Sequence, residues 1–277
     1  MRLSPHQDLA SLAPTVRALA REAGTLALAS FRPGAQTTAK LWYKNRGSSP
    51  VTAADMAVDA LLKERLAQAL PEAGWLSEET ADSSTRLKRD LVWIVDPIDG
   101  TRAFVSGHPD WCIAIGLLAE GRPVFGLVFA PEHDHLYEAV LGGGATRNGV
   151  PIRVSALDRL DGARVAGPKP LVDALERRAG RVDRVAKIPS LALRLSRVAE
   201  GSLDIGLVSA NSCDWDLAGA DLILQEAGGR VTSLEGAPVA YNQAEPIHGE
   251  LVAAPSRLHP RAIEAMTIRA RPAVSRR

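Results

Sequence analysis

The stretch LVWIVDPIDGT, residues 91–101, joins a run of five apolar residues to two aspartates that stand three positions apart. A short apolar run that ends in a turn signal is typical of a buried strand. We therefore expect a strand over 91–95 that delivers Asp96 and Asp99 into a turn. Mg²⁺ prefers carboxylate and phosphate oxygens as ligands. The stretch thus predicts a site for a divalent metal ion and a phosphate group.

The remaining residues of this stretch fit the same interpretation. Pro97 fixes one backbone angle and biases Asp96 toward extended geometry. Gly100 lets a phosphate approach the backbone closely, and Thr101 adds a hydroxyl. An Asp-Pro or Asp-Gly pair alone is often only a turn former. We favour the metal site because the complete element directly follows an apolar run.

The composition is that of a globular protein. With 277 residues, 46% of them hydrophobic and 23% charged, the chain can form one large domain or two closely packed ones. The formal net charge of +1 does not draw the protein toward nucleic acid or acidic membranes. We therefore expect no nucleic acid polymer as a partner.

The sequence also bears on location. Charged residues between Asp8 and Glu22 interrupt any signal peptide, and no apolar stretch approaches 18 residues, so we expect no stable membrane insertion. Cys112 and Cys213 lack Cys-x-x-Cys spacing and are expected to stay free in a reducing cytoplasm. The arginines of 269–277 are expected to form a solvated basic end. The sequence leaves a homodimer open.

Periodicity places the elements of the first half. Apolar residues at helical spacing predict an amphipathic helix over 8–31 and a second helix over 53–69. Asp55 falls in the first turn of the second helix, beside Thr52, which can cap it. Between the two helices, residues 36–50 are polar and predict a loop or hairpin.

Several strands and a change of pattern follow. The strands are predicted at 75–80, 91–95, 111–118, 124–129 and 136–140, and the short connections between the last three favour an antiparallel sheet. Beyond the glycines of 142–149 the pattern changes to strands that alternate with helices. We therefore expect an α+β domain over 1–150, with the antiparallel sheet and most metal ligands, and an α/β domain over 151–277.

A second acidic stretch, CDWDLAGADLILQEAGG at 213–229, predicts a helix that ends at Gly228 and has Asp216 at its N-terminus. An aspartate at this position is often only a helix cap. It can also be the ligand that the acidic turn near Asp99 still lacks.

The chain resembles the inositol monophosphatase family over residues 8 to about 265. The resemblance depends on three separated motifs that occur in the family's order: Ser-Glu-Glu-Thr at 77–80, Asp-Pro-Ile-Asp-Gly-Thr at 96–101, and Trp-Asp-Leu-Ala-Gly at 215–219, followed by Glu-Ala-Gly-Gly at 226–229. The resemblance implies an α/β protein with a layered αβαβα sandwich. It also implies a Mg²⁺-dependent, lithium-sensitive phosphomonoesterase.

The resemblance also assigns metal ligands. It implies that Glu78, Asp96 and the carbonyl of Ile98 hold a first Mg²⁺. Asp96, Asp99 and Asp216 would hold a second Mg²⁺, and a third, weaker ion would share Glu78. The expected cofactor is therefore two or three Mg²⁺ ions per site.

Further residues are assigned to catalysis and to the phosphate. The resemblance implies that Asp55 and Thr101 orient the attacking water, with Glu78 counted as catalytic as well. The amides of Gly100 and Thr101 would receive phosphate oxygens, and Asp216 would also face the substrate. No covalent phosphoenzyme is expected, because the Asp-x-Asp phosphatases that form one have their aspartates two positions apart.

The substrate is the least determined feature. Inositol-preferring members have a glutamate where this chain has Ser209. The segment from Lys187 through Ser190 and Arg194 resembles the 3'(2'),5'-bisphosphate nucleotidase, or CysQ-like, branch. Ser190 and Arg194 are therefore expected at the substrate, with Arg194 on a second phosphate, although Val208 replaces an arginine common in that branch. Arg194 can equally be a residue of a helix surface.

Three functions follow from these motifs. The first is hydrolysis of the 3'-phosphate of 3'-phosphoadenosine 5'-phosphate to AMP and phosphate. The alternative within the family is a phosphatase for inositol, histidinol or sugar monophosphates. The alternative of another class is a noncatalytic protein that binds phosphometabolites.

Overall fold

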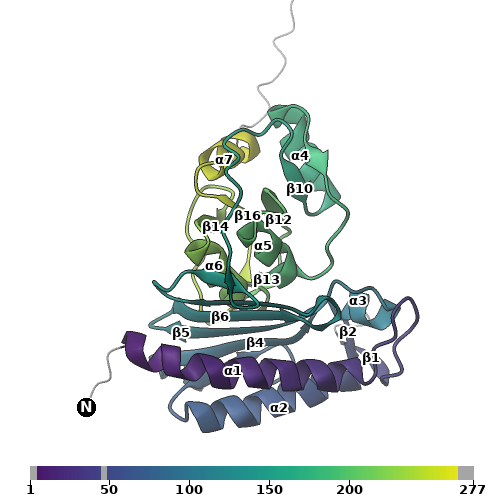
Figure 1. Ribbon diagram of the computed structural model, residues 1–277, viewed down its shortest axis with the longest axis vertical. Coiled ribbons are helices and arrows are strands. Elements are labelled where there is room, and N and C mark those ends of the chain that lie inside the picture. Colours follow the sequence, from purple (N-terminus) through teal and green to yellow (C-terminus); the bar gives the residue numbers. More distant parts are fainter. Residues whose placement is uncertain (1–4, 45–48, 268–277) are drawn as a thin grey trace, which may run out of the picture.

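Five layers of secondary structure are stacked in the order helices, sheet, helices, sheet, helices (Figure 1). The computed structural model describes residues 5–44 and 49–267. The predicted C-terminal basic end lies outside these residues. Within them no helix has the length and apolar character needed to cross a membrane.

The first layer consists of α1 (Pro5–Leu28) and α2 (Ala53–Ala69), which lie side by side under the first sheet (Figure 1). Their apolar residues at helical spacing are buried, among them Val16 on α1 and Leu62 on α2. The helix predicted over 8–31 ends three residues earlier than expected, whereas α2 has the predicted bounds. Thr52 caps α2 by accepting hydrogen bonds from the amides of its first turn, as predicted.

The segment predicted as a polar loop or hairpin is a hairpin in its described part. It comprises β1 (Leu41–Lys44) and β2 (Ser49–Thr52), which pair antiparallel, and residues 45–48 between them lie outside the described residues. Because β2 ends at Thr52 and α2 starts at the next residue, the hairpin leads directly into the capped helix end.

The first sheet has seven strands in sequence order from β3 to β9. Its pairs are antiparallel, as predicted, apart from β3 and β4, which are parallel. The expected strand over 75–80 ends at Ser77. The strands are β3 (Gly74–Ser77), β4 (Leu91–Asp99), β5 (Cys112–Ala119), β6 (Arg122–Ala130), β7 (His135–Val140), β8 (Ala145–Arg147) and β9 (Val150–Pro151), with short helical turns at Ser84–Lys88 and Pro131–His133.

The end of β4 differs from the prediction. The strand does not end at Val95 but continues to Asp99, with an irregular register between Asp96 and Asp99 opposite β5. The proline lies inside this irregularity, where its missing amide costs no ladder hydrogen bond. The turn directly follows the strand at Gly100, whose φ of 91° lies in the left-handed region.

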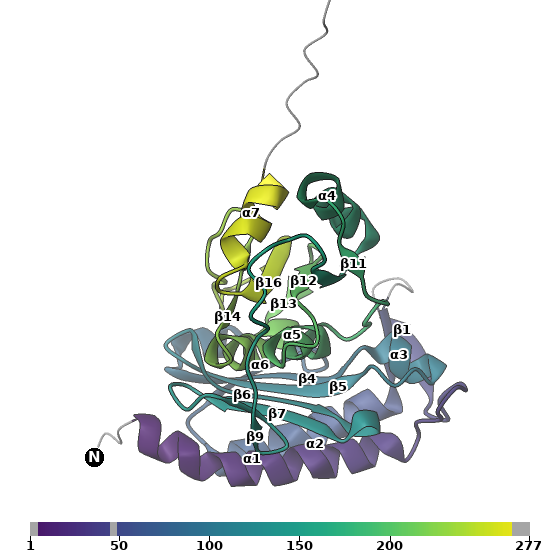
Figure 2. The same cartoon turned by 45° about the horizontal axis from the view of Figure 1, so that its top comes forward.

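The second sheet has five strands in the order β11-β10-β12-β16-β14. Figure 2 shows α4 and α7 at the end of the molecule beyond this sheet. The elements of this half are β10 (Arg164–Ala166), α4 (Lys169–Ala179), β11 (Asp183–Arg184), α5 (Leu191–Ala199), β12 (Ile205–Val208), β13 (Ser212–Cys213), α6 (Asp214–Glu226), β14 (Gly229–Ser233), β15 (Ile247–His248), β16 (Leu251–Pro255) and α7 (His259–Thr267).

The middle layer, α5 and α6, joins the two sheets. The backbone of α6 lies directly on the first sheet, because a Cβ added to Gly126 would meet the carbonyl oxygen of Gly219 at 2.2 Å. One apolar cluster includes Val128 of the first sheet, Ile223 of α6 and Ala253 of the second sheet. Since this core is shared, the domains expected at 1–150 and 151–277 stay a prediction.

Candidate metal centre

Three aspartates from distant parts of the chain converge between the first sheet and α6. Asp96 and Asp99 lie at the end of β4, and Asp216 lies in the first turn of α6. Each offers a carboxylate oxygen, and these three oxygens lie within 4.8 Å of one another. The close seating of α6 on the first sheet brings Asp216 to the other two residues.

The parallel pairing of β3 and β4 brings Glu78 to the same edge. Ser77 stands opposite Val95 in the register, and the amide of Glu78 donates to the carbonyl of Val95 at 3.3 Å. Because Ser77 is paired with Val95 in a parallel register, the next residues along the two segments, Glu78 and Asp96, lie next to each other. The nearby carboxylates of Glu79 and Asp216 add to burial in raising the pKa of Glu78 to about 8.

Burial and mutual repulsion also affect the aspartates. Burial raises the pKa of Asp96 well above its usual range, and the charges of Glu78 and Asp99 add to this effect. Burial and the charge of Asp99 raise the pKa of Asp216 to about 7. A cluster of buried carboxylates is costly in the ionised form unless a cation compensates it. The donor set is made of oxygen atoms only, which fits Mg²⁺.

The loop that connects the aspartates is fixed by its own hydrogen bonds. The amide of Ile98 donates to Asp96 Oδ1 at 3.0 Å, which orients that carboxylate. The Ile98 carbonyl, predicted to be a metal ligand, lies 3.1 Å from Thr101 Oγ1, whose single proton it shares with Asp55 as alternative acceptors. A carbonyl oxygen has two lone pairs, so this hydrogen bond leaves one available.

Asp55 and Thr101, the predicted pair for water activation, lie together. Thr101 Oγ1 donates to Asp55 Oδ1 at 3.2 Å. The amide and the hydroxyl of Thr52 donate to Asp55 Oδ2 at 2.8 and 2.5 Å. Asp55 is fully buried, and burial raises its pKa. The capping of α2 therefore also orients one predicted catalytic carboxylate.

Gly100 precedes the short helix α3 (Thr101–Ser106), and two features require a glycine there. One is its left-handed backbone. The other is space, because an added Cβ would meet the Asp110 carbonyl oxygen at 3.2 Å and the Ser190 side chain at 3.3 Å. The structure thus brings the predicted phosphate-binding glycine next to Ser190.

Ser190 contacts a metal-ligand candidate. Its Oγ donates to Asp99 Oδ2 at 2.6 Å, and it is fully buried as the N-cap of α5. The amide of Ala192 donates to the same oxygen, also at 2.6 Å. Ser190 was predicted to bind substrate, but its hydroxyl is used inside the protein.

Arg194, also predicted at the substrate, likewise has its contacts inside the protein, and its substrate role stays a prediction. Its side chain is buried, and its guanidinium donates to the carbonyls of Leu207 at 2.8 Å and Ile188 at 2.7 Å. It does not lie on a helix surface, and two of its three nitrogens are already engaged. These contacts give no support to the expected role on a second phosphate.

Sequence reasoning missed two neighbours of Glu78. Asp59 accepts hydrogen bonds from Ser77 Oγ and Thr80 Oγ1 at 2.6 and 2.7 Å. Its position one helical turn after Asp55 was the signal available. Lys44 on the hairpin forms an ion pair with Glu79, which no spacing in the sequence indicated.

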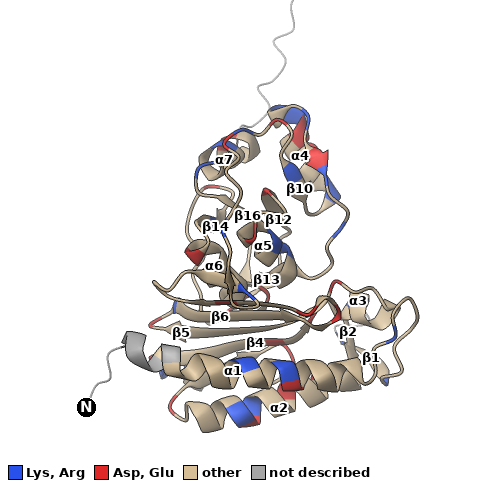
Figure 3. Ribbon diagram, in the orientation of Figure 1, with Lys and Arg blue, Asp and Glu red and all other residues tan. Residues whose placement is uncertain are grey.

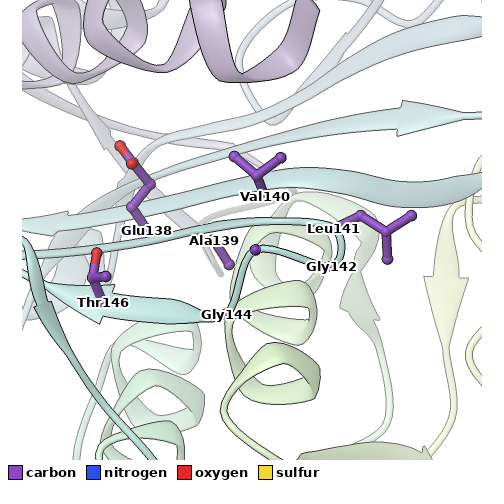
Figure 4. Close-up of a pocket in the computed structure, with 8 residues that line it drawn as sticks. Glu138, Ala139, Val140, Leu141, Gly142, Gly144 and Thr146 are labelled. Atoms are coloured by element: carbon purple, nitrogen blue, oxygen red, sulfur yellow. The ribbon is translucent and has the colours of Figure 1, made fainter. Parts of the chain in front are cut away.

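The hollow shown in Figure 4 lies elsewhere. It measures about 350 Å³ and follows the turn between β7 and β8, without any residue of the acidic cluster. The amides of Gly142 and Gly144 in this turn donate to the carboxylate of Glu226. We assign it no part in the metal centre.

Comparison with known proteins agrees with this geometry. The sequence model of the inositol monophosphatase family matches residues 8–271. The chain belongs to this family. Its members are phosphatases that depend on a metal ion, typically Mg²⁺, and the family predicted from the three motifs is thereby confirmed.

The individual relatives have different names. Inositol monophosphatase 2 of Solanum lycopersicum is 40% identical over 202 residues, which are 67% of this chain and 75% of the relative. Histidinol-phosphatase of Mycobacterium tuberculosis is 37% identical over 222 residues, covering 76% and 82%. The crystal structure of the extragenic suppressor protein SuhB from Bartonella henselae has a TM-score of 0.82 at 26% identity and covers 93% of this chain and 99% of that one. The layered α/β fold is thus confirmed, whereas the CysQ-like branch is not specifically supported.

Proposed function

We propose that this protein hydrolyses phosphate monoesters of small molecules with Mg²⁺ held by Glu78, Asp96, Asp99 and Asp216. The observation that carries the proposal is the convergence of carboxylate oxygens from β4 and α6 within 4.8 Å. Bound Mg²⁺ would polarise the phosphoryl group, lower the pKa of water and stabilise the leaving oxygen.

The residues around the cluster have separate tasks. When Thr101 donates its single hydroxyl proton to Asp55 and not to the Ile98 carbonyl, its oxygen can accept a proton from the attacking water as its own passes to Asp55. Asp55, whose pKa is raised by burial, can hold that proton during attack on phosphorus. The water oxygen bonds to phosphorus as the ester P–O bond breaks, the leaving alkoxide takes a proton from solvent water, and Asp55 returns its proton to solvent. No side chain becomes phosphorylated.

The contacts of Arg194 bear on the choice of substrate. 3'-Phosphoadenosine 5'-phosphate, the first candidate from the sequence, carries a second phosphate that needs its own cation. Arg194 was the expected cation, and its guanidinium donates to two backbone carbonyls instead. We therefore favour a substrate with a single phosphate, of the inositol, histidinol or sugar monophosphate type. Ser209, in place of a glutamate, argues against inositol within this group.

A panel of substrates tests this proposal. Phosphate release would be measured with 3'-phosphoadenosine 5'-phosphate, histidinol phosphate, inositol 1-phosphate and a sugar phosphate, each with and without Mg²⁺ and Li⁺. We expect Mg²⁺-dependent, Li⁺-inhibited release from a monophosphate. Preference for 3'-phosphoadenosine 5'-phosphate would restore the first candidate. No release from any substrate, by a protein that binds Mg²⁺, would favour the noncatalytic function.

A further inference from the structure

Helix α2 carries two buried aspartates one turn apart, and each holds a different part of the metal centre. Asp55 accepts from Thr101, which follows the aspartates of β4. Asp59 accepts from the segment that carries Glu78. Residues four apart lie on the same face of a helix, so both carboxylates point from α2 toward the end of the first sheet.

The hydrogen bonds of Asp59 come from the residues on either side of Glu78 and Glu79 in the sequence. Ser77 Oγ donates to Asp59 Oδ1 at 2.6 Å, and Thr80 Oγ1 donates to Asp59 Oδ2 at 2.7 Å. The amide of Thr80 also donates to Ser77 Oγ at 3.1 Å. Both carboxylate oxygens of Asp59 are thereby used, one on each side of residues 78–79. Asp59 is 5% exposed, so water competes little for these contacts.

We propose that Asp59 is a positioning residue, which sets the turn of residues 77–80 so that the Glu78 carboxylate is ready for Mg²⁺. This inference rests on the proposed function, because it takes Glu78 as a ligand. Without Asp59, the turn keeps the Glu78 amide bond to Val95 and the ion pair between Lys44 and Glu79. Ordering the rest of the turn would then draw on the free energy of metal binding.

A merely structural role makes a different prediction. A buried aspartate with two hydroxyl partners stabilises the fold wherever it lies, and its loss would lower the melting temperature without changing Mg²⁺ affinity. Asp204 supplies the control, because it is also buried, accepts from Ser155 Oγ at 2.6 Å and belongs to the second sheet region. It also pairs with Arg164, so Asp204→Asn is expected to cost at least as much stability.

The experiment compares Mg²⁺ binding by calorimetry and melting temperature for the full chain and four variants. Asp59→Asn weakens the hydrogen bonds from Ser77 and Thr80, and Thr80→Val removes the one from Thr80. Thr80→Ser keeps the hydroxyl, and Asp204→Asn is the control. We expect Asp59→Asn to bind Mg²⁺ about 10-fold more weakly, the lower end of the range typical for partners of metal ligands. Thr80→Val should weaken binding several-fold, while Thr80→Ser and Asp204→Asn bind like the unmodified protein.

The readings separate the two proposals. Unchanged Mg²⁺ affinity in both Asp59→Asn and Thr80→Val would overturn the positioning role while leaving the proposed function intact. Failure of the unmodified protein to bind Mg²⁺ would overturn both. If Asp59→Asn does not fold, the test is the difference in Mg²⁺ affinity between Thr80→Val and Thr80→Ser. In turnover, the positioning role predicts a higher Mg²⁺ requirement with kcat near normal at saturating Mg²⁺.

Discussion

The two halves of the molecule build the metal centre by different means. The first half supplies its acidic residues at strand ends, where Asp96 and Asp99 continue β4 and Glu78 follows β3. The second half contributes helix starts, with Asp216 in the first turn of α6 and Ser190 at the N-cap of α5. Figure 1 shows α5 and α6 between the two sheets.

The difference also appears in the way each carboxylate is held. The α5 start donates to Asp99 Oδ2 through Ser190 Oγ, and the amide of Cys213 donates to Asp216 Oδ2 at 2.7 Å. In both aspartates one oxygen is occupied by a donor from the second half. A helix start has free backbone donors, so it can hold one oxygen of a carboxylate and leave the other for a cation.

The charges away from the centre contrast with this arrangement. Figure 3 shows Lys and Arg on α4, in the outermost helix layer, where Lys169 pairs with Asp173 on the surface. Exposed pairs of this kind contribute about 0 to 1 kcal/mol. The strong electrostatic effects of this molecule are therefore expected where its two halves meet.

The largest expected effect comes from removing one ligand of either half. Asp96→Asn and Asp216→Asn should each lower turnover on the order of 10³-fold, because each takes a negative charge from the metal ligands and with it several kcal/mol of transition-state stabilisation. Steady-state kinetics at saturating Mg²⁺ would measure the loss, with circular dichroism as the control for folding. Near-normal rates in either variant would contradict the shared centre.

The second prediction concerns the cost of holding these carboxylates together. The pKa values of about 8 for Glu78 and about 7 for Asp216 lie above the ordinary values of about 4. Between pH 5 and 8 the folded, metal-free protein therefore holds protons that the unfolded chain has released. Its stability falls as the pH rises through this window. We expect a drop in melting temperature of about 5 °C or more.

Mg²⁺ should oppose this drop, because it compensates the ionised carboxylates and binds better once their protons have left. Melting curves between pH 5 and pH 8, with and without Mg²⁺, would measure both effects. Glu78→Gln should reduce the change in melting temperature of the metal-free protein between pH 5 and pH 8. A metal-free protein that becomes more stable toward pH 8 would rule out the raised pKa values.

Local sequence patterns predicted much of this arrangement. Helical periodicity and the Thr52 cap gave the bounds of α2, and the short connections of 111–141 gave an antiparallel sheet. These features depend on neighbours in the sequence, which the pattern records. The acidic motifs also predicted that Asp216 would join Asp96 and Asp99.

The features that sequence reasoning did not give depend on distant contacts. The Asp-Pro-Ile-Asp segment reads as a turn, yet pairing with β5 extends the strand to Asp99. The bond from Ser190 to Asp99 spans 91 positions. Arg194 can be buried because its guanidinium donates to the backbone carbonyls of Ile188 and Leu207. No local sequence pattern predicts which distant polar groups these side chains contact.

The smallest expected effect tests the contact between the halves at Asp99. Ser190→Ala removes the hydroxyl that donates to Asp99 Oδ2 and also the N-cap that accepts from the amide of Leu193 at 3.0 Å. We expect a loss of about 1 kcal/mol of stability from the cap. Mg²⁺ affinity should fall about 10-fold or less, because the amide of Ala192 still donates to the same oxygen.

Calorimetry and chemical denaturation would measure these two losses against Ser155→Ala, which removes a hydroxyl from buried Asp204 in the second half. That control should lose stability and keep its Mg²⁺ affinity. If Ser190→Ala also kept its affinity, the backbone of α5 alone would hold Asp99. The second half would then act on the metal centre through the position of its helix, and any small residue that leaves this position unchanged would serve at 190.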